Sequence, residues 1–155
     1  MSTVQERLHD LNLTLPKAPL PVAAYVPAVK TGNLIFVSGQ VPFKDGTLIA
    51  QGPVPSSTSL DLAQEAARQC ILNALAVLGG ALDGNLDKIT QIVRVGIFVY
   101  SDPDFTDQPK VGNGASELLV EIFGEAGRHA RAAVGSVALP LGASVEVEMV
   151  VEVKD

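Results

Sequence analysis

The chain has no tryptophan, one cysteine and two histidines among its 155 residues. The single thiol, Cys70, excludes an internal disulfide and is typical of a protein from a reducing compartment. We expect Cys70 to be a buried small hydrophobe, since it falls in the apolar stripe of a predicted helix. The histidines His9 and His129 are far apart in the sequence, and no Cys/His cluster has the spacing of a metal site. We therefore expect no metal and no organic cofactor.

Charged residues are also scarce, at 18% of the chain, whereas 47% is hydrophobic and the mean hydropathy is +0.30. Soluble domains usually carry about a quarter charged residues. No stretch approaches the roughly 18 consecutive apolar residues that a membrane-spanning helix requires. The surplus of apolar side chains therefore favours an oligomer, in which contacts between subunits cover them, and no membrane partner is expected.

Positive charge is limited to 11 Lys and Arg against 17 Asp and Glu, so the net charge is −6 and the pI is about 4.8. These basic residues are scattered, which argues against a nucleic-acid partner. The first fifteen residues carry charges where a secretory signal has its apolar core, and we predict a cytoplasmic protein. The chain also lacks a glycine-rich phosphate loop, a G-x-S-x-G elbow and an H-E-x-x-H motif.

Periodicity predicts one α+β domain over residues 1–155, with the element order β-β-(β)-α-β-α-β-β. The expected elements are a short helix over 3–12, a hairpin of Ala23–Val29 and Asn33–Ser38, and a ribbon within 41–49 around Asp45-Gly46. They continue with a helix from Leu60 to Leu78, capped by Thr58 and Asp61 and ended or loosened by Gly79-Gly80, and a strand from Ile89 to Tyr100. A helix from Pro109 to Phe123, stopped by Gly124, and two terminal strands joined at Leu139-Pro140 complete the chain.

The predicted strands are apolar on both faces. Two helices interleaved with strands favour a single sheet with both helices on one face. Something else must then cover the other face, and an identical subunit is the simplest candidate.

The terminal strands contain the most informative polar residues. Arg131 opens an otherwise apolar run, and Glu146 and Glu148, two residues apart, share one face of the last strand. One interpretation is a salt bridge between Arg131 and one of these glutamates or a C-terminal carboxylate. The other is a bidentate clamp for a small anionic substrate, with a nearby carboxylate that moves protons. His129, just before the strand, is expected to be a loop or interface residue.

The sequence resembles the RidA/YjgF family of enamine/imine deaminases. The resemblance runs from Ala23 onward. It rests on Ala24-Tyr25-Val26, G-N-L-I-F-V-S-G-Q-V-P from Gly32 to Pro42, V-R-V-G-I-F-V from Val93 to Val99, Asn113 at the opening of the second helix, and A-R-A-A-V…L-P…V-E-V-E from Ala130 to Glu148.

The resemblance implies a chorismate-mutase-like subunit, of the β-α-β-β type, assembled as a homotrimer with pockets between subunits. It implies hydrolysis of 2-aminoacrylate-type enamines and imines to 2-keto acids and ammonia without a cofactor. Arg131 would hold the substrate carboxylate and Glu146 would position or activate water. The pocket lining would include Tyr25, Ser38, Gly39, Asn113 and the backbone of Ala133, some of them from the neighbouring subunit.

Three departures from the family pattern distinguish this chain. Ala133 stands where typical members have a cysteine, residues 1–20 form an N-terminal extension, and the loop over 51–59 is longer. A sensor that binds small carboxylates without turnover is therefore an alternative to the deaminase, and a ribonuclease is a weaker one.

Overall fold

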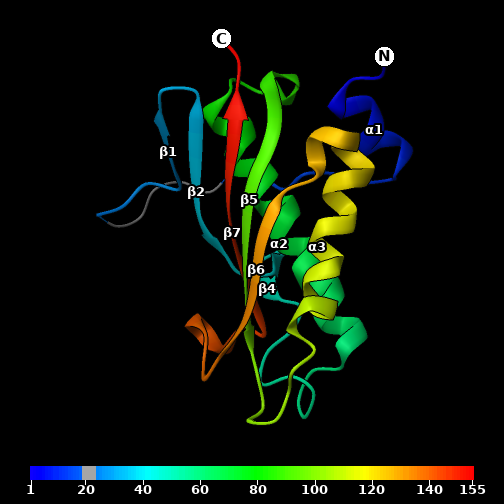
Figure 1. The fold of residues 1–155 in the computed structure, drawn as a ribbon, viewed down its shortest axis with the longest axis vertical. Coiled ribbons are helices and arrows are strands. Elements are labelled where there is room, and N and C mark those ends of the chain that lie inside the picture. Colours follow the sequence, from blue (N-terminus) through cyan, green and yellow to red (C-terminus); the bar gives the residue numbers. More distant parts are fainter. Residues whose placement is uncertain (19–23) are drawn as a thin grey trace.

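A computed structural model describes residues 1–18 and 24–155 (Figure 1). It has the predicted α+β architecture and element order. The elements are α1 (Val4–Asp10), β1 (Ala28–Thr31), β2 (Leu34–Gln40), β3 (Phe43–Lys44), β4 (Thr47–Leu48), α2 (Leu60–Ala81), η1 (Leu86–Lys88), β5 (Ile89–Tyr100), α3 (Gln108–Phe123), η2 (Gly124–Gly127), β6 (Ala130–Ser136), η3 (Pro140–Gly142) and β7 (Val145–Val153). Ala23, predicted to begin the first strand, lies outside the described residues.

Five strands form the main sheet in the order β1-β2-β7-β5-β6, and β3 and β4 form a separate ribbon. β6 runs parallel to β5, whereas the other pairs are antiparallel. The two terminal strands are therefore not neighbours, because β5 lies between them. Across this part of the sheet, Phe98 of β5 is opposite both Glu146 of β7 and Val134 of β6.

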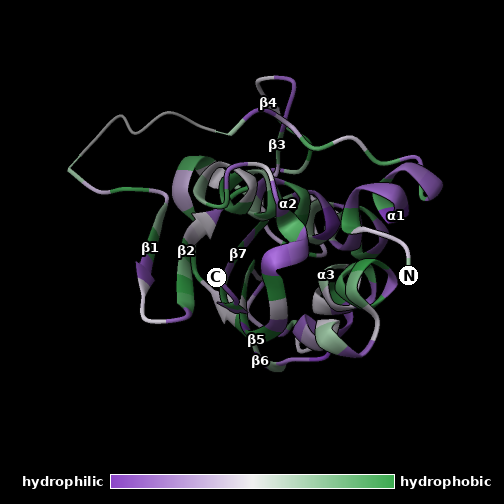
Figure 2. Cartoon of the chain, turned by 90° about the horizontal axis from the view of Figure 1, so that it is seen from above, coloured by the Kyte–Doolittle hydropathy of each residue, from purple (hydrophilic) through white to green (hydrophobic). Residues whose placement is uncertain are grey.

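Both long helices pack on one face of the sheet, as predicted (Figure 2). The alternation in β7 sets this face, because every second side chain from Val145 to Val153 is buried and those between them are only partly buried. α2 presents small side chains to the sheet and to α3, and these allow close packing; they are Ala63, Ala66, Ala67, Cys70 and Ala74, all fully buried.

The other face of the sheet is not covered by any helix of residues 1–18 or 24–155. Three apolar side chains on it are about half exposed: Val29 at 53%, Phe36 at 46% and Val134 at 47%. Val29 is directly opposite Phe36, so both side chains are on the same face. We call this surface the open face.

Three details of the predicted elements were wrong. The side chain of Ser59, not Thr58, caps α2 by accepting from the backbone N–H of Leu62. Thr58 is instead buried and bonds to Gln51 and Ser144. α2 also continues through Gly79-Gly80 to Ala81, because tertiary packing outweighs the weak helix propensity of glycine. β2 continues past Gly39 to Gln40 through a shift in register.

The predicted N-terminal helix is present and packs on the domain. Thr3 and Glu6 form a capping box, and Val4 and Leu8 are buried. The guanidinium of Arg7 donates to the carbonyl of Ile122 at the end of α3 (2.6 Å). None of the helices in the described ranges is long and apolar enough to cross a membrane.

Candidate functional site

The first group of predicted site residues surrounds Arg131, in the second position of β6. Arg131 is opposite Val95, which is buried beneath the helices, so its side chain is directed toward α3. Nη1 donates to Asn113 Oδ1 (3.0 Å) and to Ser116 Oγ (3.1 Å), and Nη2 donates to the carbonyl of Pro109 (3.3 Å). All three acceptors belong to α3, which therefore fixes the guanidinium.

This arrangement leaves part of the guanidinium available to a ligand. Of the five N–H donors of an arginine, three are used by α3. Nε–H and one hydrogen of Nη2 have no acceptor in the described part of the chain, and Arg131 is solvent-exposed. Two adjacent donors of this kind match the two oxygens of a carboxylate.

The predicted salt bridge to a glutamate is not formed. No carboxylate of the described residues lies within 4 Å of Arg131, and Glu148 instead pairs with Arg94 on the open face (3.3 Å). The interpretation of Arg131 as a closing salt bridge of the sheet is therefore wrong.

Two small residues beside Arg131 shape its surroundings. A Cβ at Gly112 would lie 3.2 Å from Nη1 of Arg131 and 2.8 Å from Cδ1 of Ile97, so the lack of a side chain at this residue lets the guanidinium lie close against α3. Ala133, two residues along β6, shares a face with Arg131 and packs against the core opposite Ile97. Arg131, Asn113 and Ala133 thus form one half-site, which we call the arginine half-site.

The second group surrounds Glu146 on the open face. Its side chain is half-buried against Gly39 of β2, where a Cβ would collide with Glu146 Oε1. Ser38 connects β2 to the preceding segment, because its N–H donates to the carbonyl of Pro27 (2.9 Å) and its Oγ donates to that of Val26 (3.0 Å). Tyr25, next to Val26, is 66% exposed. We call Glu146, Gly39 and Ser38 the glutamate half-site.

The environment of Glu146 favours its protonated form. Burial raises the pKa of this carboxyl above its usual range, and the negative charge of Glu148 on the same strand face raises the pKa further. A carboxyl with a raised pKa accepts and returns a proton more readily near neutral pH, which suits acid–base chemistry.

The two half-sites lie on opposite faces of the sheet within one chain. Arg131 is on the face that the helices cover, whereas Glu146 is on the open face, two strands away. The structure thus brings Arg131 together with Asn113, and Glu146 together with Gly39, and it keeps these two groups apart.

The sequence prediction missed three contacts of Arg131: Pro109, Gly112 and Ser116. Of these, only Ser116 had a signal in the sequence. It follows Asn113 by three residues, and this helical spacing places both on the same helix face. His129 is also closer to the site than expected, because its Nε2 lies 2.9 Å from Ser116 Oγ.

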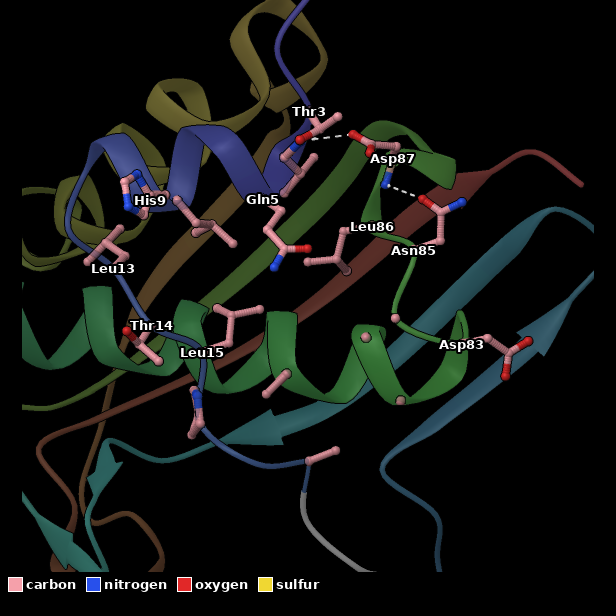
Figure 3. A pocket seen from close by; sticks show the side chains of 18 residues that line it. Thr3, Gln5, His9, Leu13, Thr14, Leu15, Asp83, Asn85, Leu86 and Asp87 are labelled. Carbon is pink, nitrogen blue, oxygen red and sulfur yellow. Dashed lines mark hydrogen bonds between the residues drawn. The ribbon is translucent and has the colours of Figure 1, made fainter.

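A cavity of about 810 Å³ lies elsewhere, between α1, the C-terminal end of α2 and η1 (Figure 3). There Asp87 Oδ1 accepts from the N–H of Val4 (2.9 Å), and Asn85 accepts from that of Asp87 (3.1 Å). Its lining contains none of the predicted site residues.

Across residues 1–18 and 24–155, no group of three or more His, Cys, Asp or Glu side chains is arranged to hold a metal ion.

The sequence matches the family described as "YjgF/chorismate mutase-like, putative endoribonuclease" over residues 5–153. It is 42% identical to Protein TCP17 of Trypanosoma cruzi, over 98% of this chain and 95% of that protein. It is 29% identical to the 2-iminobutanoate/2-iminopropanoate deaminase of Dermatophagoides farinae, over 92% of this chain and 95% of that protein. The crystal structure of Atu1372 from Agrobacterium tumefaciens, a protein of unknown function, superposes with a TM-score of 0.92 at 43% identity, covering 98% of this chain and 94% of that one.

Proposed function

Because this chain belongs to the YjgF/chorismate mutase-like family, we propose that it is a hydrolase that deaminates small imines and enamines to 2-keto acids and ammonia. The reaction takes place in a pocket between copies of a cytoplasmic homotrimer and uses no cofactor. The name of the Dermatophagoides relative, an imine deaminase, supports the reaction class.

The open fork of Arg131 is the observation that carries this proposal. A guanidinium held by Asn113, Ser116 and Pro109, with Nε–H and one Nη2–H directed to no described acceptor, is pre-organised for a carboxylate. An imino acid bound there has its carboxylate fixed and its C=N carbon one bond away. This favours a substrate of the 2-iminopropionate type.

The separation of the half-sites supports a pocket shared between subunits. Arg131 and Glu146 occupy opposite faces of one sheet, so a substrate of a few atoms cannot contact both in the same chain. The open face carries the exposed side chains of Val29, Phe36 and Val134, which a second copy would bury. In such an assembly the glutamate half-site of one subunit meets the arginine half-site of its neighbour.

The chemistry needs little beyond orientation and proton transfer. Water adds to the C=N carbon of the protonated imine while Glu146 takes one of the water protons, and a neutral carbinolamine forms. Glu146 then returns this proton to nitrogen and accepts the hydroxyl proton as the C=O bond forms and the C–N bond breaks; ammonia takes up that proton, and ammonium and the 2-keto acid leave. An enamine enters the same route after protonation of its carbon gives the protonated imine.

Ala133 favours a second candidate function, a trimeric sensor or carrier of small carboxylates. Typical family members have a cysteine at this position, and here the side chain offers no thiol or other polar group. A protein with the Arg131 clamp and an incomplete reacting centre would bind 2-keto acids without turning over imines.

A coupled assay separates the two functions. An amino-acid oxidase generates 2-iminopropionate, and ammonia release is followed with and without the protein. The deaminase proposal predicts faster release, which Arg131→Ala abolishes. Binding of 2-ketobutyrate without acceleration for several imines would establish the sensor instead. RNA cleavage that co-elutes with the protein and disappears in Arg131→Ala would favour the ribonuclease.

A further inference from the structure

We propose that His129 is a positioning residue that fixes the guanidinium of Arg131 through the hydroxyl of Ser116. This inference rests on the proposed function, because it assigns Arg131 as the carboxylate clamp. His129 precedes β6, half-buried between α3 and η2, and it does not itself touch the open fork of Arg131.

The partners of His129 define its tautomer. Nδ1 lies 2.6 Å from the carbonyl of Gly127, which can only accept a hydrogen bond. The proton of the neutral ring must therefore be on Nδ1, and Nε2 is left as an acceptor. Because Nε2 lies 2.9 Å from Ser116 Oγ, the serine hydroxyl donates to His129.

The orientation of the Ser116 hydroxyl then determines what Arg131 encounters. With its hydrogen directed to Nε2, Oγ presents lone pairs to Nη1 of Arg131 at 3.1 Å. A chain of three hydrogen bonds results, from Arg131 to Ser116, from Ser116 to His129 and from His129 to Gly127, in which every donor has an acceptor. Each bond in such a chain polarises the next.

The electrostatics of the site favour the neutral ring that this chain needs. Burial lowers the pKa of His129 below its ordinary value, and the charge of Arg131 lowers it further, although the carbonyl of Gly127 acts in the opposite direction. At neutral pH the ring is therefore uncharged and can accept from Ser116.

The consequence is a fixed direction for the two free donors of Arg131. Asn113 and Ser116 both accept from Nη1, so loss of either lets the planar group turn more freely about its Cγ–Cδ and Cδ–Nε bonds. His129→Phe keeps a ring but removes the acceptor for Ser116. His129→Gln places a side-chain amide oxygen near the position of Nε2 and restores the acceptor.

The test combines ¹⁵N NMR of the side chains with binding of 2-ketobutyrate by calorimetry, using the full chain and the variants His129→Phe, His129→Gln and Ser116→Ala. We expect the Nδ1–H tautomer in the wild type and faster exchange of the Arg131 Nε–H in His129→Phe. The affinity of His129→Phe for 2-ketobutyrate should fall by up to about tenfold, as loss of one hydrogen bond between uncharged groups implies. His129→Gln should remain near the wild type.

Ser116→Ala should lose as much affinity for 2-ketobutyrate as His129→Phe does. The double variant should bind no more weakly than either single variant, since both substitutions interrupt the same chain of hydrogen bonds. An Nε2–H tautomer of His129 would overturn the assignment. So would equal losses of affinity for 2-ketobutyrate in His129→Phe and His129→Gln at equal thermal stability. If the wild type binds no 2-keto acid, the proposed function fails, and the tautomer and the Arg131 exchange rates alone decide the role of His129.

Discussion

Arg131 combines two properties at the scale of single residues: three of its donors are fixed by α3, and two adjacent donors have no acceptor in the described chain. Replacement by lysine keeps the charge but removes the planar fork. We expect Arg131→Lys and Arg131→Ala each to lower kcat/KM for 2-iminopropionate by at least about a hundredfold, the value of a charge-assisted pair.

Arg128→Ala is the matched control for these variants. Arg128 lies three residues away in the sequence, and its exposed pair with Glu125 (3.2 Å) is of a kind that contributes little to stability. Its kcat/KM should stay within about twofold of the wild type, as expected for a surface change. Equal activity in the Arg131 and Arg128 variants would show that the clamp is misassigned.

Gly39 gives a second prediction, which concerns the position of Glu146. A methyl group at residue 39 collides with Oε1 of this glutamate, so Gly39→Ala must displace the carboxylate. We expect kcat to fall about a hundredfold, in the range for loss of general acid–base catalysis. Gly79→Ala is the control, because its added Cβ meets nothing within 4 Å and should leave kcat unchanged. Full activity in Gly39→Ala would show that catalysis does not depend on the position of the Glu146 carboxylate.

The raised pKa of Glu146 predicts a pH effect. Glu146 must be ionised to take a proton from water, so activity falls as pH drops through its pKa, which lies above the usual range for a glutamate because of burial and the charge of Glu148. Glu148→Gln removes the second cause and should move the acidic limb of the kcat/KM profile to lower pH. An acidic limb that stays in place or moves to higher pH in Glu148→Gln would contradict the charge of Glu148 as a cause of the raised pKa of Glu146.

At the scale of elements, α3 has two separable roles. Gly112 leaves room for Arg131 on one side, whereas a Cβ at Gly114 would collide with the backbone carbonyl of Gln64 in α2. We expect Gly112→Ala to raise the Kd for 2-ketobutyrate with little change in stability, because Cδ1 of Ile97 can move. Gly114→Ala should instead cost about 1–3 kcal/mol in the free energy of unfolding, as overpacking does.

Chemical denaturation and calorimetry on the same samples would measure both quantities. If both variants changed only stability, α3 would be a packing element without a direct role in placing the guanidinium.

The elements themselves could be predicted from local patterns. Gly124 ends α3 with a positive φ, as its position after the apolar stripe indicated. The start of α2 at Leu60 was predicted correctly, but its cap was misplaced by one residue, because Ser59 and Thr58 are equally good caps in sequence and only the burial of Thr58 against Ser144 distinguishes them. The separation of Arg131 from Glu146 could not be predicted, since it depends on β5 entering the sheet between β6 and β7.

At the scale of the whole molecule, the sequence indicated an uncovered sheet face because its strands were apolar on both sides. The open face carries exposed apolar side chains, and the exposure of Phe36 and Val134 supports a second copy of the chain as its cover. The proposed division of the active site between copies would explain why neither half-site forms a complete reacting centre in one chain. It would also make assembly a condition for activity.

Complementation between two inactive variants tests this account most directly. Arg131→Ala and Glu146→Gln would be coexpressed with different tags, and assemblies carrying both tags would be assayed for ammonia release from 2-iminopropionate. In the proposed cyclic trimer, an assembly that carries both tags has one interface of its three that joins an intact arginine half to an intact glutamate half, whichever variant is in the majority, so about a third of wild-type activity should return. Mixed assemblies as inactive as the separate variants would contradict a site shared between subunits.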